Sequence, residues 1–174
     1  RVLLVGAGGA ASGVVDSLVT LGAIVTIVNR NKEKAQLLAT SRSFFFTNLV
    51  DTPKLPFPTN NAKEHNSNRI DALGYADLVD QQFDIIINAT STGLTDEMLR
   101  LPDTLFKPGA LAYEMMYGRD TPFMKFARKH GAAVVSDGLG MLVEQATESF
   151  FLWRNVRPDT RAVLKKLRAE SPIA

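Results

Sequence analysis

The sequence predicts an α/β protein built on a doubly wound, mostly parallel sheet, with helices on both faces and a helix at the C-terminus. Short aliphatic runs, of the kind that parallel sheets bury on both faces, alternate with longer segments of helical periodicity along most of the chain. A glycine-rich turn joins the first such run to the first helical segment. Strands that alternate with helices form βαβ units, and consecutive units of this kind build an open parallel sheet.

The segments expected to form regular structure follow one another along the chain. The expected strands are residues 2–5, 23–28, 83–89, 110–113 and 132–136. The expected helices are residues 10–21, 32–39, 122–130, 140–155 and 160–169. Gly22 and Gly131 are stop signals for two of these helices, and Pro122 stands in a first-turn position. In the helix expected at 140–155, apolar residues recur every three or four positions, at Leu142, Ala146, Phe150 and Trp153.

Composition favours one domain over the whole chain, residues 1–174. With 174 residues, of which 45% are hydrophobic, the chain can bury a core of its own. A stretch at about residues 49–67 breaks the alternation of strands and helices, because it is rich in proline and asparagine and has little periodicity. It is too long for an ordinary connection, and we interpret it as a surface insertion. A terminal helix is expected at about 160–169.

The composition also excludes several kinds of site. Cysteine is absent, which excludes disulfides, cysteine-based metal sites and a thiol nucleophile. His65 and His130 have no partner at metal-ligand spacing, so no metal site is expected. The net charge of +2 does not indicate nucleic-acid binding, and the basic stretch at 157–168 has the amphipathic spacing of a packed or docking terminal helix. No apolar run approaches the ~18 residues of a membrane span, so we expect a cytoplasmic protein without membrane contact.

Three glycines, Gly6, Gly8 and Gly9, stand between the first expected strand and the first expected helix. Gly6 permits a tight turn, and Gly8 allows the backbone to approach a ligand without an intervening Cβ. The helix that follows points its unpaired N–H groups and positive dipole end at an anion, such as the pyrophosphate of a dinucleotide. A strand-to-helix turn needs glycine even without a ligand, but strand, turn and helix together favour dinucleotide binding.

The end of the second expected strand indicates which dinucleotide binds. NAD-preferring sites usually place Asp or Glu there, to accept a hydrogen bond from the adenosine ribose. This chain has Asn29, Arg30 and Asn31 instead, and Lys34 follows one helical turn beyond Arg30. The guanidinium and ammonium groups suit a 2′-phosphate, and the asparagines can donate hydrogen bonds. The pattern favours NADP over NAD, although a solvated basic start of a helix would contain the same residues.

Five short motifs resemble, in their order, the C-terminal NADP-binding domain of the shikimate dehydrogenase family: GAGGAA, NRNKEK, NATSTGL, YEMMYG and SDGLGMLVEQA. They begin at residues 6, 29, 88, 113 and 136, so the resemblance extends over the chain apart from its proline- and asparagine-rich stretch. It implies a Rossmann-like domain that binds NADP(H). Members of the family reduce 3-dehydroshikimate to shikimate with NADPH, in the pathway to the aromatic amino acids.

The resemblance also implies a role for each matched residue. The residues expected at the pyrophosphate are Gly6, Ala7, Gly8, Gly9 and Ala10. Those expected around the adenosine 2′-phosphate are Asn29, Arg30, Asn31 and Lys34. Those expected along the rest of the cofactor cleft are Asn88, Ala89 and Thr90, with Met115 and Gly138 near the nicotinamide. Those expected to reach the substrate are Tyr117 and Gln145.

The residues themselves leave several of these roles open. On residue type alone, Tyr117 is as well explained by half-buried packing, Gln145 by an exposed helix position, and Met115 by the core. Two positions also depart from the family pattern. Glu114 stands where the family often has aspartate, and Asn31 where threonine is commoner. The first change adds a methylene, and the second keeps a hydrogen-bonding side chain.

No catalytic residue is expected in this chain. The family assigns proton transfer to a lysine and an aspartate of an N-terminal domain, and only five residues precede Gly6. An Asp before glycine, such as Asp137, favours a turn or capping role. We therefore expect part of an NADP-dependent shikimate dehydrogenase that shares its small substrate with that domain and is inactive alone. A quinate-type paralogue and a non-catalytic NADP-binding module are the alternatives, and the oligomeric state is open.

Overall fold

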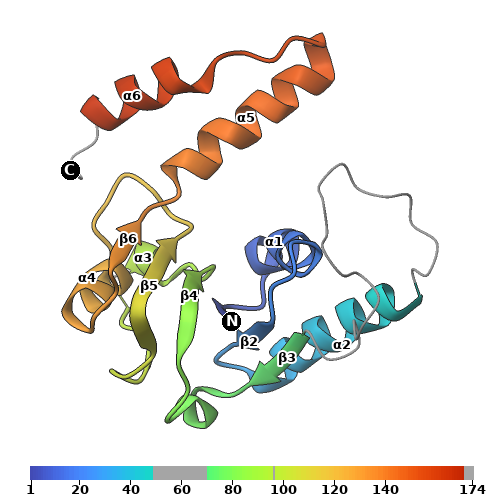
Figure 1. Cartoon of the computed structure of the whole chain (residues 1–174), viewed down its shortest axis with the longest axis vertical. Helices are drawn as coiled ribbons and strands as arrows, with labels where there is room; N and C mark the ends of the chain where they lie inside the picture. Colours follow the sequence, from blue (N-terminus) through green and yellow to red (C-terminus); the bar gives the residue numbers. More distant parts are fainter. Residues whose placement is uncertain (49–69, 96, 171–174) are drawn as a thin grey trace.

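The computed structural model describes residues 1–48, 70–95 and 97–170, which form a parallel sheet flanked by helices (Figure 1). In the described residues six strands pair in the order β3-β2-β1-β4-β5-β6, and every pairing is parallel. The strands are β1 (Val2–Val5), β2 (Val25–Val28), β3 (Ile70–Leu73), β4 (Phe83–Asn88), β5 (Phe106–Glu114) and β6 (Val134–Ser136). This topology confirms the predicted doubly wound sheet.

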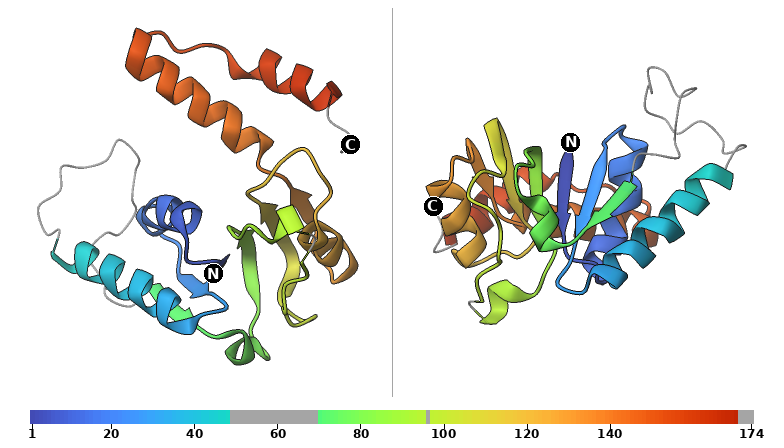
Figure 2. Two further views of the ribbon diagram at one scale, coloured as in Figure 1. Left: turned by 180° about the vertical axis from the view of Figure 1, so that it is seen from behind. Right: turned by 90° about the horizontal axis from the view of Figure 1, so that it is seen from below.

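Helices connect these strands and continue beyond the last one. They are α1 (Gly9–Thr20), α2 (Lys32–Asn48), α3 (Thr92–Thr95), α4 (Pro122–Lys129), α5 (Leu139–Arg154) and α6 (Thr160–Glu170), and a 3₁₀ turn, η2 (Tyr75–Leu78), follows β3. The views in Figure 2 show α5 leaving the end of β6 and α6 running back alongside it. The helices expected at 10–21, 122–130, 140–155 and 160–169 are thus found within one or two residues of their predicted bounds.

Two buried clusters hold the helices to opposite faces of the sheet. On one face, Val15 of α1 and Ala35 of α2 pack with Leu4 of β1. On the other face, Phe123 of α4 packs with Leu3 of β1. Neighbouring residues of β1 therefore enter different cores, which explains why this strand is an unbroken aliphatic run and not an alternating one.

The register of the central strands brings their carboxyl ends to one edge. Val5 is the partner of both Val28 and Asn88, and Asn88 is in turn the partner of Glu114. The first residues beyond β1, β4 and β5, including Gly6 and Met115, therefore lie side by side. Between β1 and β4 the strand order reverses, since β2 and β3 lie on one side of β1 and β4 to β6 on the other. Open parallel sheets bind ligands at this switch point.

The short elements η2 and α3 were not expected from the sequence, and three longer elements also differ from the expectation. The strand β3 was not expected, because Ile70 is its one buried residue and the strand lies at the sheet edge. Helix α2 continues to Asn48 instead of ending near residue 39, and Phe46 packs against the core there despite the weak helix propensity of its neighbours. Strand β5 begins at Phe106 and not at residue 110, since Pro108 and Gly109 interrupt its apolar pattern without ending it. The expected insertion at 49–67 lies outside the described residues.

Helix α5 is found where expected, but its periodic apolar residues lie on the exposed side. Trp153 is 78% exposed and Phe150 43% exposed. The side facing the rest of the described chain consists instead of Leu139, Val143 and Thr147. Apolar periodicity predicted the helix correctly. The face that carries Phe150 and Trp153 is nevertheless exposed, and the face that carries Val143 packs against the rest of the described chain.

Candidate cofactor site

The turn after β1 requires glycine at its first position. Gly6 has φ +114°, a conformation that L side chains rarely adopt, and its N–H donates to the carbonyl oxygen of Val28 at 2.7 Å. A Cβ on Gly6 would lie 3.0 Å from the carbonyl oxygen of Ala89, at the end of β4. The turn is therefore pressed against the neighbouring strand end, and only glycine fits both the backbone angle and the space.

The next two glycines have no such explanation within the described chain. Gly8 and Gly9 do not have positive φ, and a Cβ on either would meet no described atom within 4 Å. Gly8 precedes α1 without a side-chain cap, and the first turn of α1 holds no acidic residue. The first N–H groups of a helix have no intrahelical acceptors, so those of Gly9, Ala10 and Ala11 are available to a ligand. An open, uncapped helix N-terminus with room above two glycines fits a phosphate group.

The predicted 2′-phosphate residues lie in the loop between β2 and α2 and, for Lys34, in the first turn of α2. The side-chain oxygen of Asn31 accepts from the Lys34 N–H at 2.8 Å, so Asn31 caps α2, while the Asn29 amide donates to the Asn31 carbonyl at 2.9 Å. The Arg30 guanidinium is 89% exposed and lies 3.7 Å from the Glu97 carboxylate. Within the described ranges Lys34 has no ion-pair partner. Arg30 of the loop and Lys34 of α2 can therefore reach an anion, and the two asparagines set the shape of the loop.

The ends of β4 and β5 are joined by a buried polar network. The Glu114 carboxylate accepts from the Asn88 side-chain amide at 2.7 Å, from the Thr121 hydroxyl at 2.9 Å and from the Met116 N–H at 3.1 Å. Burial raises the pKa of the Glu114 carboxyl, and the bonds from Met116, Asn88 and Thr121 oppose that rise. On its other side, Asn88 accepts from the Thr90 hydroxyl at 2.7 Å. Of the predicted cleft residues, Asn88 and Thr90 are thus brought together.

The loop after β5 touches the start of α5. The Gly138 N–H donates to the Met116 carbonyl oxygen at 2.8 Å, and a Cβ on Gly138 would overlap the backbone of Met115. Met115 is partly buried against the cluster that α1 and α2 cover, so part of its side chain belongs to the core. Tyr117 is 49% exposed on this loop, and Gln145 is exposed on α5. No contact between these two side chains is found in the described part of the chain.

Two residues of this region were not singled out as site residues from the sequence. Thr121 accepts from the Met124 N–H at 3.3 Å and so caps α4, and a Thr before Pro122 is a recognisable sequence signal for such a cap. Gly93 is a second case, since a Cβ there would lie 2.7 Å from the Met116 sulfur. No sequence signal indicated this contact, because Met116 is 23 positions away from Gly93 in the chain.

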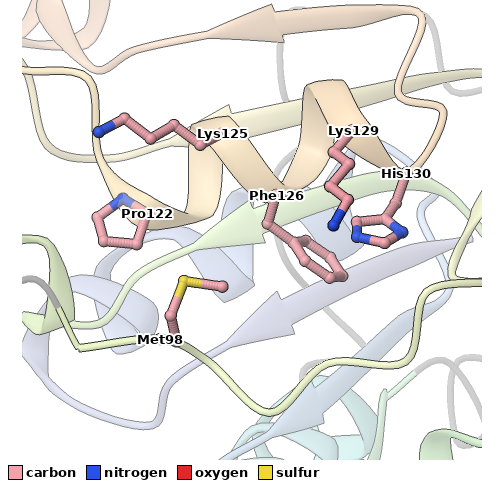
Figure 3. A pocket seen from close by; sticks show the side chains of 6 residues that line it. All are labelled: Met98, Pro122, Lys125, Phe126, Lys129 and His130. Carbon is pink, nitrogen blue, oxygen red and sulfur yellow. The ribbon is translucent and has the colours of Figure 1, made fainter.

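A separate hollow of about 380 Å³ opens along α4 and contains none of the predicted site residues (Figure 3). Its lining consists of Met98, Pro122, Lys125, Phe126, Lys129 and His130. The motif residues lie instead along the edge formed by the carboxyl ends of the parallel strands. Among the helices of the described residues, none combines the length and the apolar character that a membrane span requires.

Comparison with known sequences shows to which family of proteins the chain is related. The family described as shikimate / quinate 5-dehydrogenase matches residues 1–55, and the shikimate 5′-dehydrogenase C-terminal domain matches residues 138–168. The shikimate dehydrogenase (NADP(+)) of Methylobacillus flagellatus is 48% identical over 170 residues, which are 97% of this chain. The chain belongs to the shikimate dehydrogenase family. It corresponds to the C-terminal, NADP-binding portion of these proteins.

The chain spans about half the length of the shikimate dehydrogenases that it matches, since the aligned region is 55% of the M. flagellatus protein. Solved structures give the same coverage. An Ael1 enzyme from Pseudomonas putida is 40% identical with a TM-score of 0.76, over 96% of this chain and 54% of that one. A shikimate dehydrogenase in complex with NADP⁺ is 25% identical with a TM-score of 0.73, over 98% of this chain and 54% of that one.

Proposed function

We propose that this chain is the NADP(H)-binding part of a shikimate dehydrogenase that reduces 3-dehydroshikimate to shikimate. The observation that carries the proposal is the open space above Gly8 and Gly9 at the uncapped N-terminus of α1. A turn that served only to connect β1 and α1 would need Gly6, but it would not need two further glycines without neighbours. A phosphate-bearing ligand explains all three.

The cofactor, when bound, supplies the hydride, and the residues of this chain hold and orient it. The pyrophosphate is held by Gly6, Ala7, Gly8, Gly9 and Ala10. The 2′-phosphate is surrounded by Asn29, Arg30, Asn31 and Lys34. The rest of the cofactor contacts Asn88, Ala89 and Thr90, and its nicotinamide lies at Met115 and Gly138. The substrate is reached by Tyr117 and Gln145. The NADP⁺ in the complex of the related shikimate dehydrogenase supports the choice of cofactor.

Calorimetric titration of the chain with NADP⁺ and with NAD⁺, in low-phosphate buffer, tests the binding part of the proposal. We expect NAD⁺ to bind at least ~30-fold more weakly, a difference of about 2 kcal/mol. Gly8→Val is the informative variant, because its extended backbone (φ −96°) accepts a side chain that would occupy the phosphate position. Its thermal melt should match the wild type while binding is lost. Gly13→Ala, farther along α1 with nothing within 4 Å, is the matched control that should bind normally.

Activity requires a separate test. We assign no proton-transfer group to the described residues, and in our proposal the groups that move the proton come from the portion of the relatives that this chain does not span. The chain alone should therefore bind NADP⁺ without oxidising shikimate, while the full-length protein should do both. Assays with shikimate and with quinate distinguish the two substrates in the family's description. If the full-length protein binds NADP⁺ but oxidises neither substrate, the chain is a non-catalytic NADP-binding module.

A further inference from the structure

Glu114 is an acid without a cation at the centre of the site. Its side chain is fully buried at the end of β5, and no ion pair to it is found among the described residues. Burying a carboxylate away from water is costly, and its three hydrogen-bond donors are neutral groups. A neutral side chain would fill the same space at lower cost, so packing alone does not explain an acid at this position.

The three donors come from the ends of two neighbouring strands. One is the amide of Asn88, at the end of β4, whose own oxygen accepts from the Thr90 N–H at 3.1 Å and from the Thr90 hydroxyl at 2.7 Å. The other two are the Met116 N–H and the Thr121 hydroxyl, which lie at the two ends of the loop after β5. One carboxylate thus binds the turn that follows β4, through Asn88, and both ends of the loop that follows β5, through Met116 and Thr121.

We propose that Glu114 is a positioning residue, whose carboxylate fixes Asn88 and the Met115–Thr121 loop in the relative placement that brings nicotinamide and substrate together. The inference rests on the proposed function, because Met115 and Tyr117 of this loop are the residues assigned there to nicotinamide and substrate. The adenosine end of the site, at Arg30 and Lys34, lies outside the network. Loss of the carboxylate should therefore affect the reacting end of the cofactor and spare the other end.

Glutamine at this position matches glutamate in size but not in polarity. One of its two polar atoms is an NH₂ group, which would face either the Asn88 amide or the Met116 N–H, and both are donors. Asn88 cannot turn its amide over without cost, because its oxygen already accepts two bonds from Thr90. Aspartate keeps two acceptor oxygens and shortens the side chain by one methylene. Glu114→Asp is therefore the conservative variant, and Glu114→Gln is the disruptive one.

The experiment compares these variants in the full-length protein. For Glu114→Gln we expect kcat to fall about 10- to 100-fold, as for a modest misplacement of reacting groups. The dissociation constant of adenosine 2′,5′-bisphosphate, which probes the adenosine end alone, should change by less than about twofold. Glu114→Asp should recover most of kcat. Phe83→Leu, a buried substitution at the other end of β4, is the control that lowers the melting temperature without lowering kcat.

Two results would overturn the inference: a Glu114→Gln protein with wild-type kcat, or equal losses of kcat in Glu114→Gln and Phe83→Leu. If Glu114→Gln does not fold, Thr121→Val breaks the same network from the loop end and should lower kcat in the same selective way. A wild-type protein that binds no adenosine 2′,5′-bisphosphate refutes the proposed function instead. In that case amide hydrogen exchange tests the positioning role of Glu114. The backbone amides of Thr90 and Met116 should lose protection together in Glu114→Gln and keep it in Phe83→Leu.

Discussion

Gly138 and Met115 are in backbone contact, so close that a Cβ on Gly138 would overlap the Met115 carbonyl oxygen. The Gly138 N–H also donates to the next carbonyl, that of Met116, at 2.8 Å. The loop after β5 and the start of α5 therefore meet through main-chain atoms, which cannot move aside as a flexible side chain can.

Gly138→Ala should consequently displace this loop. We expect a loss of about 1–3 kcal/mol in the free energy of unfolding, as for overpacking in a tight interior, and weaker NADP⁺ binding. Gly140→Ala, two residues further into α5 with no atom within 4 Å of the added Cβ, is the control and should be neutral or stabilise by up to ~1 kcal/mol. Urea unfolding and calorimetry measure the two effects. Equal stability of the two variants would contradict the contact.

Arg30 should determine the preference for NADP⁺ over NAD⁺. A charged hydrogen bond to a phosphate is worth enough that Arg30→Ala should weaken NADP⁺ binding about 10-fold and leave NAD⁺ binding unchanged. Glu97→Gln removes the acid that lies 3.7 Å from Arg30, and it should strengthen NADP⁺ binding slightly, since both side chains are largely exposed. Calorimetry with both nucleotides tests this, and a parallel loss of NADP⁺ and NAD⁺ affinity in Arg30→Ala would refute the assignment.

The sequence predicted the fold class and the edge at which the site residues lie, because those depend on local patterns. An unbroken aliphatic strand followed by glycines is visible in ten residues, and parallel strands place such turns side by side. The roles of Gly8 and Gly9 remain predictions. The edge strand β3 was missed because the prediction depended on aliphatic runs, and Asp71 and its half-buried neighbours form no such run.

The contacts that connect the motifs could not be predicted in this way. Glu114 and Asn88 are 26 positions apart, and nothing in either motif indicates that their side chains form a hydrogen bond. Periodicity also fails to tell which side of α5 packs, as the exposed Trp153 shows. Hydrophobic spacing reports that a helix has an apolar face, but the partner of that face is a property of the whole fold.

The pKa of Glu114 predicts how stability depends on pH. Burial raises this pKa above its ordinary value of 4.5, which means that the carboxyl binds a proton more readily in the folded state than in the unfolded state. The contribution of the group to the free energy of unfolding is therefore fully present below pH 4.5 and is lost as the pH rises through the raised pKa. Glu114→Gln has no such term, so its deficit in melting temperature should be larger at about pH 4 than at about pH 7.5. A deficit that grows with pH would reverse the sign of the shift.

Arg168 connects the terminal helix to the site. Its guanidinium forms an ion pair with Asp137, whose side chain is only 1% exposed, and Asp137 also accepts from the Leu139 N–H at 3.3 Å at the start of α5. The second carboxylate oxygen of Asp137 is buried and has no hydrogen-bond partner among the described residues. Helix α6 buries no residue of its own in the described structure, so this pair is a principal link between α6 and the strand edge.

Arg168→Met should therefore destabilise the chain by about 1–3 kcal/mol, less than for a fully buried pair because Arg168 is partly exposed. The loss comes mainly from leaving the Asp137 charge buried and unpaired. Asp137→Asn removes that charge, so the double variant should lose less than the sum of the two single losses. A double-mutant cycle in urea measures this coupling, which should exceed about 0.5 kcal/mol. Additive losses would mean that α6 is not held by this pair in solution, and its place beside Asp137 would then have another cause.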